Sequence, residues 1–280
     1  MMNIMMAANS DVYNGVELVV YSTMTHNKNI NWYIFTMDLA VGTHDGTIIY
    51  RGLFPEHKKK LYDIVKYFDV NSNIVFIDSY DFYSEHLTGS VNELTNFTPY
   101  ASLRLIADLA LPHVTDLLYL DCDTAVCSNL ESMYFNCKSD VSEYAYAVYA
   151  DEACDGDGEM VSGVMFLNLR KIREDGFLER ARKNYMENLY RFPDQMALRD
   201  SGKIAKLSPL YGYMWDHRKT GATPAIVHFT HEYPCKIYSQ EINKATFYRM
   251  FPEFAYVKEG CELLEKILFT ERRENLDLNH

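Results

Sequence analysis

The chain has 280 residues, of which 48% are hydrophobic, and it carries a formal net charge of −12. This acidic balance argues against a general nucleic-acid-binding protein, which needs a basic surface. It leaves phosphorylated small molecules open as ligands, because a bound metal ion can supply positive charge locally. The length is sufficient for one large domain with a sizeable hydrophobic core.

Cysteine spacing and hydropathy exclude further classes. The six cysteines form no C-x-x-C pair, so a zinc knuckle is not expected. A chain of this size needs no disulfides, so we expect a reducing, cytoplasmic compartment. No stretch approaches the roughly 18 apolar residues of a membrane-spanning helix. The apolar N-terminus lacks a basic region and is expected to form a buried strand rather than a signal peptide. Membrane contact is expected to be at most peripheral, at the inner face.

Short apolar runs alternate with helical patterns along the chain. The expected strands cover residues 3–8, 31–37, 73–78, 116–121, 143–149, 163–169 and 223–230. The expected helices cover residues 15–27, 57–68, 99–111 and 175–189, and a helical turn is expected within 191–198. This alternation predicts an α/β domain with a mostly parallel central sheet. Ligands of such sheets bind beyond the carboxyl ends of the strands.

Two carboxylates follow the apolar run at the end of the fourth expected strand. Asp121 and Asp123 flank Cys122 in the segment LLYLDCDTAV. Side chains two apart on a strand share a face, so a positive charge is expected between them, from a metal ion, an arginine or a lysine. The alternative is a turn with two solvated carboxylates. The apolar flanks favour the metal site, because unpaired carboxylates are costly there.

Three further segments carry candidate site residues. His228 ends an apolar strand and is a borderline ligand that suits Mn²⁺ or Zn²⁺ beside carboxylates, although a core histidine is the commoner case. Arg104 is expected to pair with Asp108 one helical turn later, with a phosphate or the D-x-D carboxylates as the functional alternative. Asp194 precedes Gln195 at the start of a helical turn and is expected to be its N-cap.

Several phosphate- and cation-binding motifs are absent from the sequence. It contains no P-loop. The segment 156–163 fails the dinucleotide-binding pattern, because Val161 stands where the last glycine belongs. The acidic run 151–159 fails the calcium-loop pattern, because Ala153 occupies a ligand position. A phosphatase with a D-x-D nucleophile is also disfavoured, because that motif normally lies near the first strand.

Taken together, five segments resemble family 8 glycosyltransferases, which include glycogenin and bacterial galactosyl- and glucosyltransferases of lipopolysaccharide. The matching segments are NIMMAANSDVY, RLIADLALPHVTDLLYLDCDTAV, SGVMFLNLRKI, PDQMAL and IVHFT. They occur in family order over residues 3–236. The resemblance implies a GT-A nucleotide-sugar-binding fold and a Mn²⁺- or Mg²⁺-dependent, retaining transfer from UDP-glucose or UDP-galactose to a glycan or lipid-linked sugar acceptor.

The resemblance also implies roles for individual residues. The residues matching the metal ligands are Asp121, Asp123 and His228. Those matching the nucleotide-binding positions are Ala8, Asn9, Tyr13, Arg104, Asp121, Cys122, Asp123 and Lys236. The residues matching the catalytic positions beside the donor sugar are Gln195, Asp194 and Arg104. The implied organisation is a GT-A domain over residues 1–238 with a helical appendage over residues 239–280.

The sequence departs from the family pattern at several of these positions. Val161 stands directly before Ser162 and Gly163, where the family pattern has an asparagine. Asn9 stands where the family pattern has an aspartate on the first strand. His231 replaces a glycine, and Pro234 stands where a lysine belongs, so Lys236 serves only after a two-residue shift. These changes fit an altered sugar or acceptor. They also fit the alternative of a degenerate glycosyltransferase that binds a nucleotide-sugar or a partner without transfer.

Overall fold

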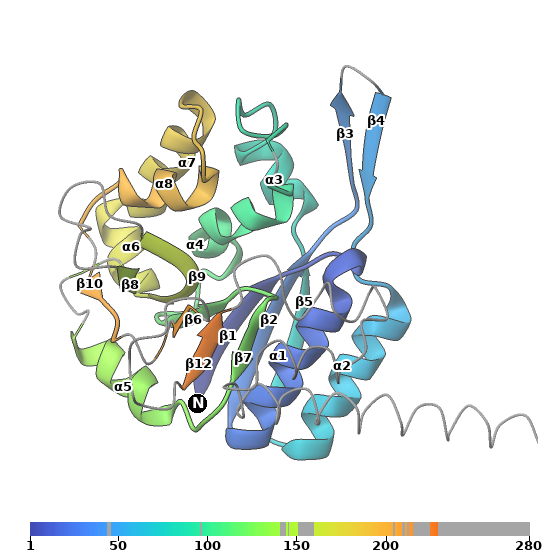
Figure 1. Cartoon of the computed structure of the whole chain (residues 1–280), viewed down its shortest axis with the longest axis vertical. Helices are drawn as coiled ribbons and strands as arrows, with labels where there is room; N and C mark the ends of the chain where they lie inside the picture. Colours follow the sequence, from blue (N-terminus) through green and yellow to red (C-terminus); the bar gives the residue numbers. More distant parts are fainter. Residues whose placement is uncertain are drawn as a thin grey trace, which may run out of the picture.

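A computed structural model of the chain describes residues 1–43, 46–95, 97–140, 144, 146–150, 160–203, 205–208, 211, 213–214 and 225–228. The acidic run 151–159, the positions His231, Pro234 and Lys236, and the expected appendage at 239–280 lie outside these residues. Within the described part, strands and helices alternate as the sequence predicts (Figure 1).

A seven-stranded sheet forms the centre of the molecule, in the order β10-β8-β9-β6-β1-β2-β5. Its strands are β1 (Met2–Ala7), β2 (Ile30–Thr36), β5 (Asn73–Asp78), β6 (Leu117–Leu120), β8 (Tyr146–Ala150), β9 (Met160–Leu167) and β10 (Ala205–Lys206). Strand β1 runs parallel to both β2 and β6, whereas β9 is antiparallel to β6 and β8. The sheet is therefore mostly parallel, and the carboxyl ends of β1 and β6 lie next to each other.

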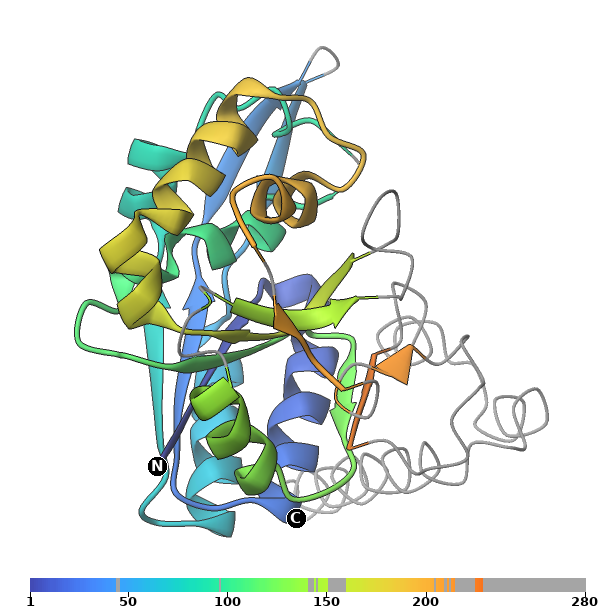
Figure 2. The same cartoon turned by 90° about the vertical axis from the view of Figure 1, so that its left-hand side faces the viewer.

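Helices cover both faces of this sheet (Figures 1 and 2). The α-helices are α1 (Tyr13–His26), α2 (Pro55–Phe68), α3 (Tyr80–His86), α4 (Ala107–Ala110), α5 (Glu131–Asp140), α6 (Leu169–Asp175), α7 (Phe177–Glu187) and α8 (Pro193–Arg199). Two 3₁₀ helices are η1 (Ser10–Val12) and η2 (Pro99–Ile106). None of the helices in the described ranges combines the length and apolar character needed to cross a bilayer.

The strand side chains divide the core into two layers. On β1, Ile4 and Met6 join the cluster that packs against α1, α2 and α5. Met5 and Ala7 join the cluster that packs against η2 and α6 to α8. This division follows from the alternation of side chains on a strand, and it explains why the strands read as continuous apolar runs.

Two smaller sheets complete the described architecture. Strand β12 (Ile226–His228) lies between β7 (Thr124–Val126) and β11 (Tyr213–Met214), antiparallel to β7 and parallel to β11. The hairpin of β3 (Leu39–Thr43) and β4 (Gly46–Tyr50) projects from the body of the protein (Figure 1). The sequence patterns did not predict this hairpin, β7, β10, β11, α3, α5 or α6.

Two predicted elements differ from the structure for identifiable reasons. The helix expected over residues 99–111 is a 3₁₀ helix followed by one α-helical turn. Ser102 Oγ and Arg104 Nε donate to the carbonyls of Pro99 and Ala101, three residues earlier, and these bonds compete with regular α-helical pairing. The strand expected over 163–169 spans Met160–Leu167 instead, because Asn168 caps α6 by accepting from the backbone of Lys171.

Candidate active site

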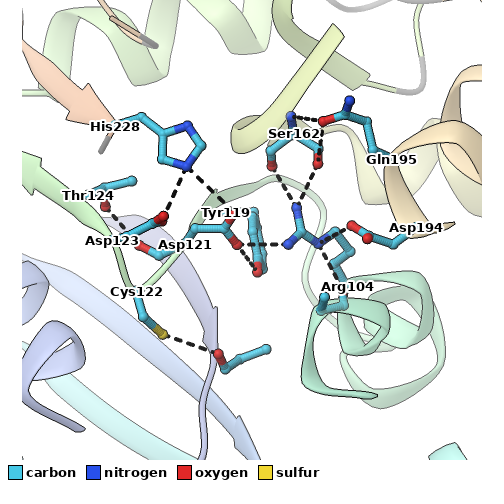
Figure 3. Close-up of polar contacts among 12 residues, drawn as sticks. Arg104, Tyr119, Asp121, Cys122, Asp123, Thr124, Ser162, Asp194, Gln195 and His228 are labelled. Carbon is cyan, nitrogen blue, oxygen red and sulfur yellow. Dashed lines mark hydrogen bonds and ion pairs between the residues drawn. The ribbon is translucent and has the colours of Figure 1, made fainter. Parts of the chain in front are cut away.

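Asp121 and Asp123 lie in the turn that joins β6 to β7 (Figure 3). Strand β6 ends at Leu120, so the prediction that strand alternation brings the two carboxylates together was wrong. The turn is held instead by two hydrogen bonds. The Asp121 amide donates to the carbonyl of Gly163 at 2.8 Å, and Thr124 Oγ1 donates to the carbonyl of Asp121 at 2.9 Å.

His228 reaches this turn through the pairing of β12 with β7. The register places His228 opposite Thr124. Its Nε2 atom lies 3.2 Å from Asp123 Oδ1 and 3.9 Å from Asp121 Oδ2. The three candidate ligand atoms lie within 4.8 Å of one another. The structure therefore brings together the three residues that the sequence singled out for a metal.

The surroundings of His228 fit a metal ligand. The residue is 6% exposed, and its Nδ1 atom has no hydrogen-bond partner among the described residues. Burial lowers the pKa of the imidazole, but the nearby carboxylates of Asp123 and Asp121 together outweigh burial and raise the pKa overall. Two carboxylates and one imidazole form a mixed donor set that suits a first-row divalent cation.

Arg104 lies at the centre of a buried ion-pair network beside the carboxylates. The residue is 3% exposed. Its Nη2 atom is 2.7 Å from Asp121 Oδ1, and its Nε atom is 3.1 Å from Asp194 Oδ2. The guanidinium carbon lies 4.2 Å from the centre of the Tyr119 ring, whose hydroxyl donates to Asp121 Oδ1 at 2.6 Å. The expected pairing of Arg104 with Asp108 was wrong.

Asp108 pairs with another arginine. Arg182 Nη1 on α7 donates to Asp108 Oδ1 at 2.7 Å and to the carbonyl of Leu105 at 2.7 Å. This contact holds the end of η2 in place. Because Asp108 is bound to Arg182, Arg104 pairs instead with Asp121 in the turn formed by Asp121, Cys122 and Asp123 (the D-x-D turn). The alternative interpretation of Arg104, as a guanidinium offered to the D-x-D carboxylates, is the one that the geometry confirms.

Asp194 and Gln195 lie in the first turn of α8. Phe192 is the N-cap of this helix, and no side chain caps it, so the expected capping role of Asp194 was wrong. Burial raises the pKa of the Asp194 carboxyl, and the Arg104 guanidinium opposes that shift. Gln195 Oε1 accepts hydrogen bonds from the backbone N–H and the hydroxyl of Ser162, at 3.0 and 3.2 Å.

The expected nucleotide-binding residues lie at the adjacent end of β1. Ala8 is fully buried directly after this strand. Asn9 Oδ1 caps η1 by accepting from the amide of Val12 at 3.2 Å. Tyr13 is the first residue of α1, and its ring stacks on the ring of His57, with centroids 3.9 Å apart.

A direct contact joins this strand end to the D-x-D turn. Cys122 Sγ donates to the carbonyl of Ala7 at 3.3 Å. The structure therefore places the ends of β1 and β6 in one region, as parallel neighbours require.

Comparison with known proteins identifies the family. The model of glycosyl transferase family 8 matches residues 3–233. The chain belongs to glycosyl transferase family 8. A search of curated proteins gave no significant match.

Solved glycosyltransferase structures share the fold of this family 8 protein. The galactosyltransferase LgtC in complex with donor and acceptor sugar analogs is 13% identical, with a TM-score of 0.64, and the match covers 95% of this chain and 96% of that one. GlyE of Streptococcus pneumoniae TIGR4 is 17% identical, with a TM-score of 0.58, over 82% of this chain and 55% of that one. Mouse xyloside xylosyltransferase 1 is 10% identical, with a TM-score of 0.57, over 83% and 98%. These similarities establish the GT-A-type fold.

Two polar residues of this candidate site were not predicted from the sequence. Tyr119 lies inside an apolar strand, where an aromatic side chain is expected to be core. Ser162 precedes Gly163 in the matching segment SGVMFLNL, but no role was assigned to it. The available signal was Ser162 next to Gly163 within an otherwise apolar strand, because a glycine in a strand often marks a place where another group approaches closely.

Gly163 provides a test of the packing around His228. A Cβ atom at this position would lie 2.2 Å from Cε1 of His228. We expect Gly163→Ala to displace the imidazole, to cost about 1–3 kcal/mol of unfolding free energy and to weaken divalent-cation binding at the candidate metal site, probed with Mn²⁺, roughly tenfold. Thermal melts and Mn²⁺ titrations measure the two effects. Gly42→Ala is the matched control, because no atom lies within 4 Å of its added Cβ. Wild-type Mn²⁺ affinity in Gly163→Ala would contradict the assignment of His228.

Proposed function

We propose that this family 8 glycosyltransferase transfers a hexose, glucose or galactose, from a UDP-sugar to a glycan or lipid-linked sugar acceptor. The proposed reaction retains the anomeric configuration and depends on Mn²⁺ or Mg²⁺. The observation that carries the proposal is the convergence of Asp121, Asp123 and His228 beside the carboxyl end of β1. The structure of LgtC, solved in complex with donor and acceptor sugar analogs, supports the same class of substrates.

In this proposal Asp121, Asp123 and His228 hold the divalent cation. The bound cation supplies Lewis-acid stabilisation of the negative charge that develops on UDP as the sugar–phosphate bond breaks. The Gly163 position supports the assignment, because the lack of a side chain there leaves room for the imidazole.

Arg104, Asp194 and Gln195 form the proposed catalytic group. The carboxylates of Asp121 and Asp194 raise the pKa of the Arg104 guanidinium above its ordinary value, although burial opposes them. Arg104 therefore stays charged and adds a fixed positive field at the site where the diphosphate is released. Asp194 and Gln195 are proposed to face the donor sugar.

The remaining assignments concern the nucleotide and the chain as a whole. We propose that Ala8, Asn9, Tyr13 and Cys122, together with Lys236, bind the UDP moiety. We also propose a GT-A domain over residues 1–238 with an appendage at 239–280, cytoplasmic and in at most peripheral contact with the membrane. The acidic composition supports the absence of a nucleic-acid partner.

A second candidate function is binding without transfer. The departures at Val161, His231 and Pro234 favour it, because they replace residues of the family pattern around the donor sugar and diphosphate. The convergence of the metal-ligand candidates with Arg104 and Asp194 favours the enzyme.

The deciding experiment measures UDP release from a panel of UDP-sugars, with Mn²⁺ and with EDTA, in the absence of acceptor. We expect slow, Mn²⁺-dependent hydrolysis of UDP-glucose or UDP-galactose, which would establish the enzyme and identify its donor. If no sugar is released with or without candidate acceptors, while UDP binds tightly in Mn²⁺, the binding function replaces the enzymatic one.

The pH dependence of Mn²⁺ binding tests the role of His228. Only the neutral imidazole binds a metal, and the pKa of His228 lies above its ordinary value of 6.5. Mn²⁺ affinity should therefore fall as the pH drops through this raised pKa. Without metal, in EDTA, the stability of the fold has the opposite pH dependence. The contact between the His228 imidazolium and the carboxylates stabilises the fold at low pH, and this contribution is lost as the pH rises through the folded-state pKa of His228.

His228→Ala is expected to raise the Mn²⁺ concentration required for UDP binding at least about tenfold and to remove the pH dependence that the raised pKa of His228 causes. Calorimetric titrations at several pH values measure both effects. An unaltered Mn²⁺ titration in this variant would contradict the assignment of His228 as a ligand.

A further inference from the structure

The hairpin of β3 and β4 forms a two-stranded sheet that no other strand of the described residues joins. Its residue pairs run in continuous register from Leu39–Tyr50 to Thr43–Gly46. The hairpin projects from the body of the protein at the top of Figure 1. An isolated two-stranded hairpin is marginally stable at best in water, so it needs either a packed face or a further strand.

The two strands of this hairpin differ in how they contact the protein. On β3, Leu39 and Val41 are buried in the core cluster that packs against η2 and α6 to α8. On β4, residues 46–49 are exposed. Ile48 is 45% exposed and Ile49 is 59% exposed. Strand β4 therefore presents two branched aliphatic side chains to solvent, beside an outer backbone edge that pairs with no strand of the described residues.

The edge of β4 lacks the features that normally keep strand edges from pairing. Such edges are protected by lysine, by proline or by a bulge. The β4 segment GTIIY contains neither residue, and its register with β3 is unbroken. Strand β5, at the edge of the seven-stranded sheet, is different: it ends in Asp78, and Lys58 Nζ lies 5.8 Å from the centre of the Phe76 ring. The free edge of β4 is therefore the one suited to receive another strand.

The distribution of charge favours a second copy of this chain as the partner. The net charge of −12 opposes contact between two copies over most of their surface. Residues 39–43 and 46–50 carry no charged side chain. At the base of the hairpin, Arg51 Nη1 lies 3.3 Å from Asp38 Oδ2, so the flanking charges neutralise each other. Two copies can therefore meet here without repulsion, whereas a lipid surface would favour basic side chains.

We propose that two copies of this chain associate through β4, which pairs antiparallel with its counterpart about a two-fold axis, so that the two hairpins form one four-stranded sheet. Such an interface is self-complementary and closed. The register that overlaps all of residues 46–50 sets Ile48 opposite the same residue of the second copy and Thr47 opposite Ile49. Directly opposite aliphatic side chains cover one another. The association needs neither metal nor nucleotide, so it is independent of the proposed function.

Sedimentation equilibrium of the full chain, without ligands, tests the association. We expect a reversible dimer with a dissociation constant on the order of 10–100 µM, because one pair of strands buries less surface than a standard interface. Ile48→Lys sets two like charges opposite each other and should raise this constant roughly 100-fold. Val75→Lys is the matched control, because Val75 is 48% exposed on the edge strand β5, and it should leave the constant unchanged. Circular dichroism and thermal melts verify that both variants fold.

A cysteine substitution tests the register of the pairing. Directly opposite residues of antiparallel strands have Cα atoms about 4.5–5.5 Å apart, which a disulfide can bridge. We expect Ile48→Cys to form covalent dimers on mild oxidation, well above the background from the native cysteines of wild type. Gly42→Cys is the control within the same hairpin, since no atom lies within 4 Å of its added Cβ. In the proposed sheet this position lies three strand spacings, about 14 Å, from its counterpart.

Three results would overturn the proposal. The first is a chain that stays monomeric up to about 1 mM, well above the range expected for one pair of strands. The second is a dimer that Ile48→Lys leaves intact, and its disruption by Val75→Lys would then place the interface at β5. The third is equal cross-linking of Ile48→Cys and Gly42→Cys, because only the first position lies at the proposed junction of the two strands.

Discussion

Replacing Asp123 by asparagine is expected to abolish Mn²⁺-dependent UDP binding while leaving the fold intact. Asp123 Oδ1 lies 3.2 Å from His228 Nε2, and its side chain remains 18% exposed at the edge of the site. An amide oxygen binds a divalent cation far less strongly than a carboxylate. Mutation of residues that only hydrogen-bond to a metal ligand typically lowers metal affinity about 10- to 100-fold, so loss of a ligand itself should cost at least as much. We therefore expect UDP affinity in Mn²⁺ to fall at least about 100-fold. Isothermal titration with UDP, in Mn²⁺ and in EDTA, measures the effect.

Asp121→Asn is the informative comparison for this variant. Asp121 Oδ1 also accepts from Arg104 and Tyr119, so its replacement should lower both UDP affinity and the melting temperature in EDTA. Asp123→Asn should lower only the affinity when the melts are run above the raised pKa of His228, where no imidazolium–carboxylate contact is lost. Unchanged UDP affinity in Asp123→Asn would rule out the metal assignment of the D-x-D turn.

Replacing Arg104 by methionine is expected to destabilise the protein strongly. Arg104 is buried and lies between the carboxylates of Asp121 and Asp194, which are 2.7 and 3.1 Å away. Removing one member of a buried ion pair leaves uncompensated charge, which typically costs about 3–5 kcal/mol of unfolding free energy. Urea unfolding of the metal-free protein measures this cost. Lysine is not a substitute, because it cannot reproduce the several directed contacts of a guanidinium.

Two further variants make this prediction specific. In Arg104→Met the carboxylates of Asp121 and Asp194 lose their positive partner. Adding Asp194→Asn removes one of these two unpaired charges and should recover part of the lost unfolding free energy. Arg199→Met is the matched control, since Arg199 is half exposed and, among the described residues, forms its ion pair with Asp200 on the surface, where such a contact is worth about 0–1 kcal/mol. A loss below about 1 kcal/mol in Arg104→Met would contradict the buried network.

Much of the fold was predictable because its main elements are local patterns. The apolar runs of β1, β2 and β5 and the amphipathic pattern of α2 each occupy one continuous segment, and the structure contains them within a few residues of the prediction. The 3₁₀ helix η2 was mispredicted, because the side chains of Ser102 and Arg104 redirect backbone pairing and periodicity does not register this effect.

The candidate metal site was predictable in its members but not in its geometry. Asp121, Asp123 and His228 were each conspicuous as polar residues at the ends of apolar runs. Their proximity depends on β12 pairing with β7 in a register that sets His228 opposite Thr124. The partner of Arg104 was mispredicted for a related reason, since Asp108 is nearer in sequence but is bound to Arg182.

The sequence by itself determined the α/β class, the strand ends that carry carboxylates, and the residue types available for a metal. These properties depend on side-chain pattern and on chemistry that each residue carries wherever it lies. Only the tertiary structure decided which charges meet, which oxygen of Asp121 faces Arg104, and which atom of Gln195 is held by Ser162. Such contacts join segments far apart in the chain, and hydrogen-bond direction depends on the relative placement of both groups, which no local pattern encodes.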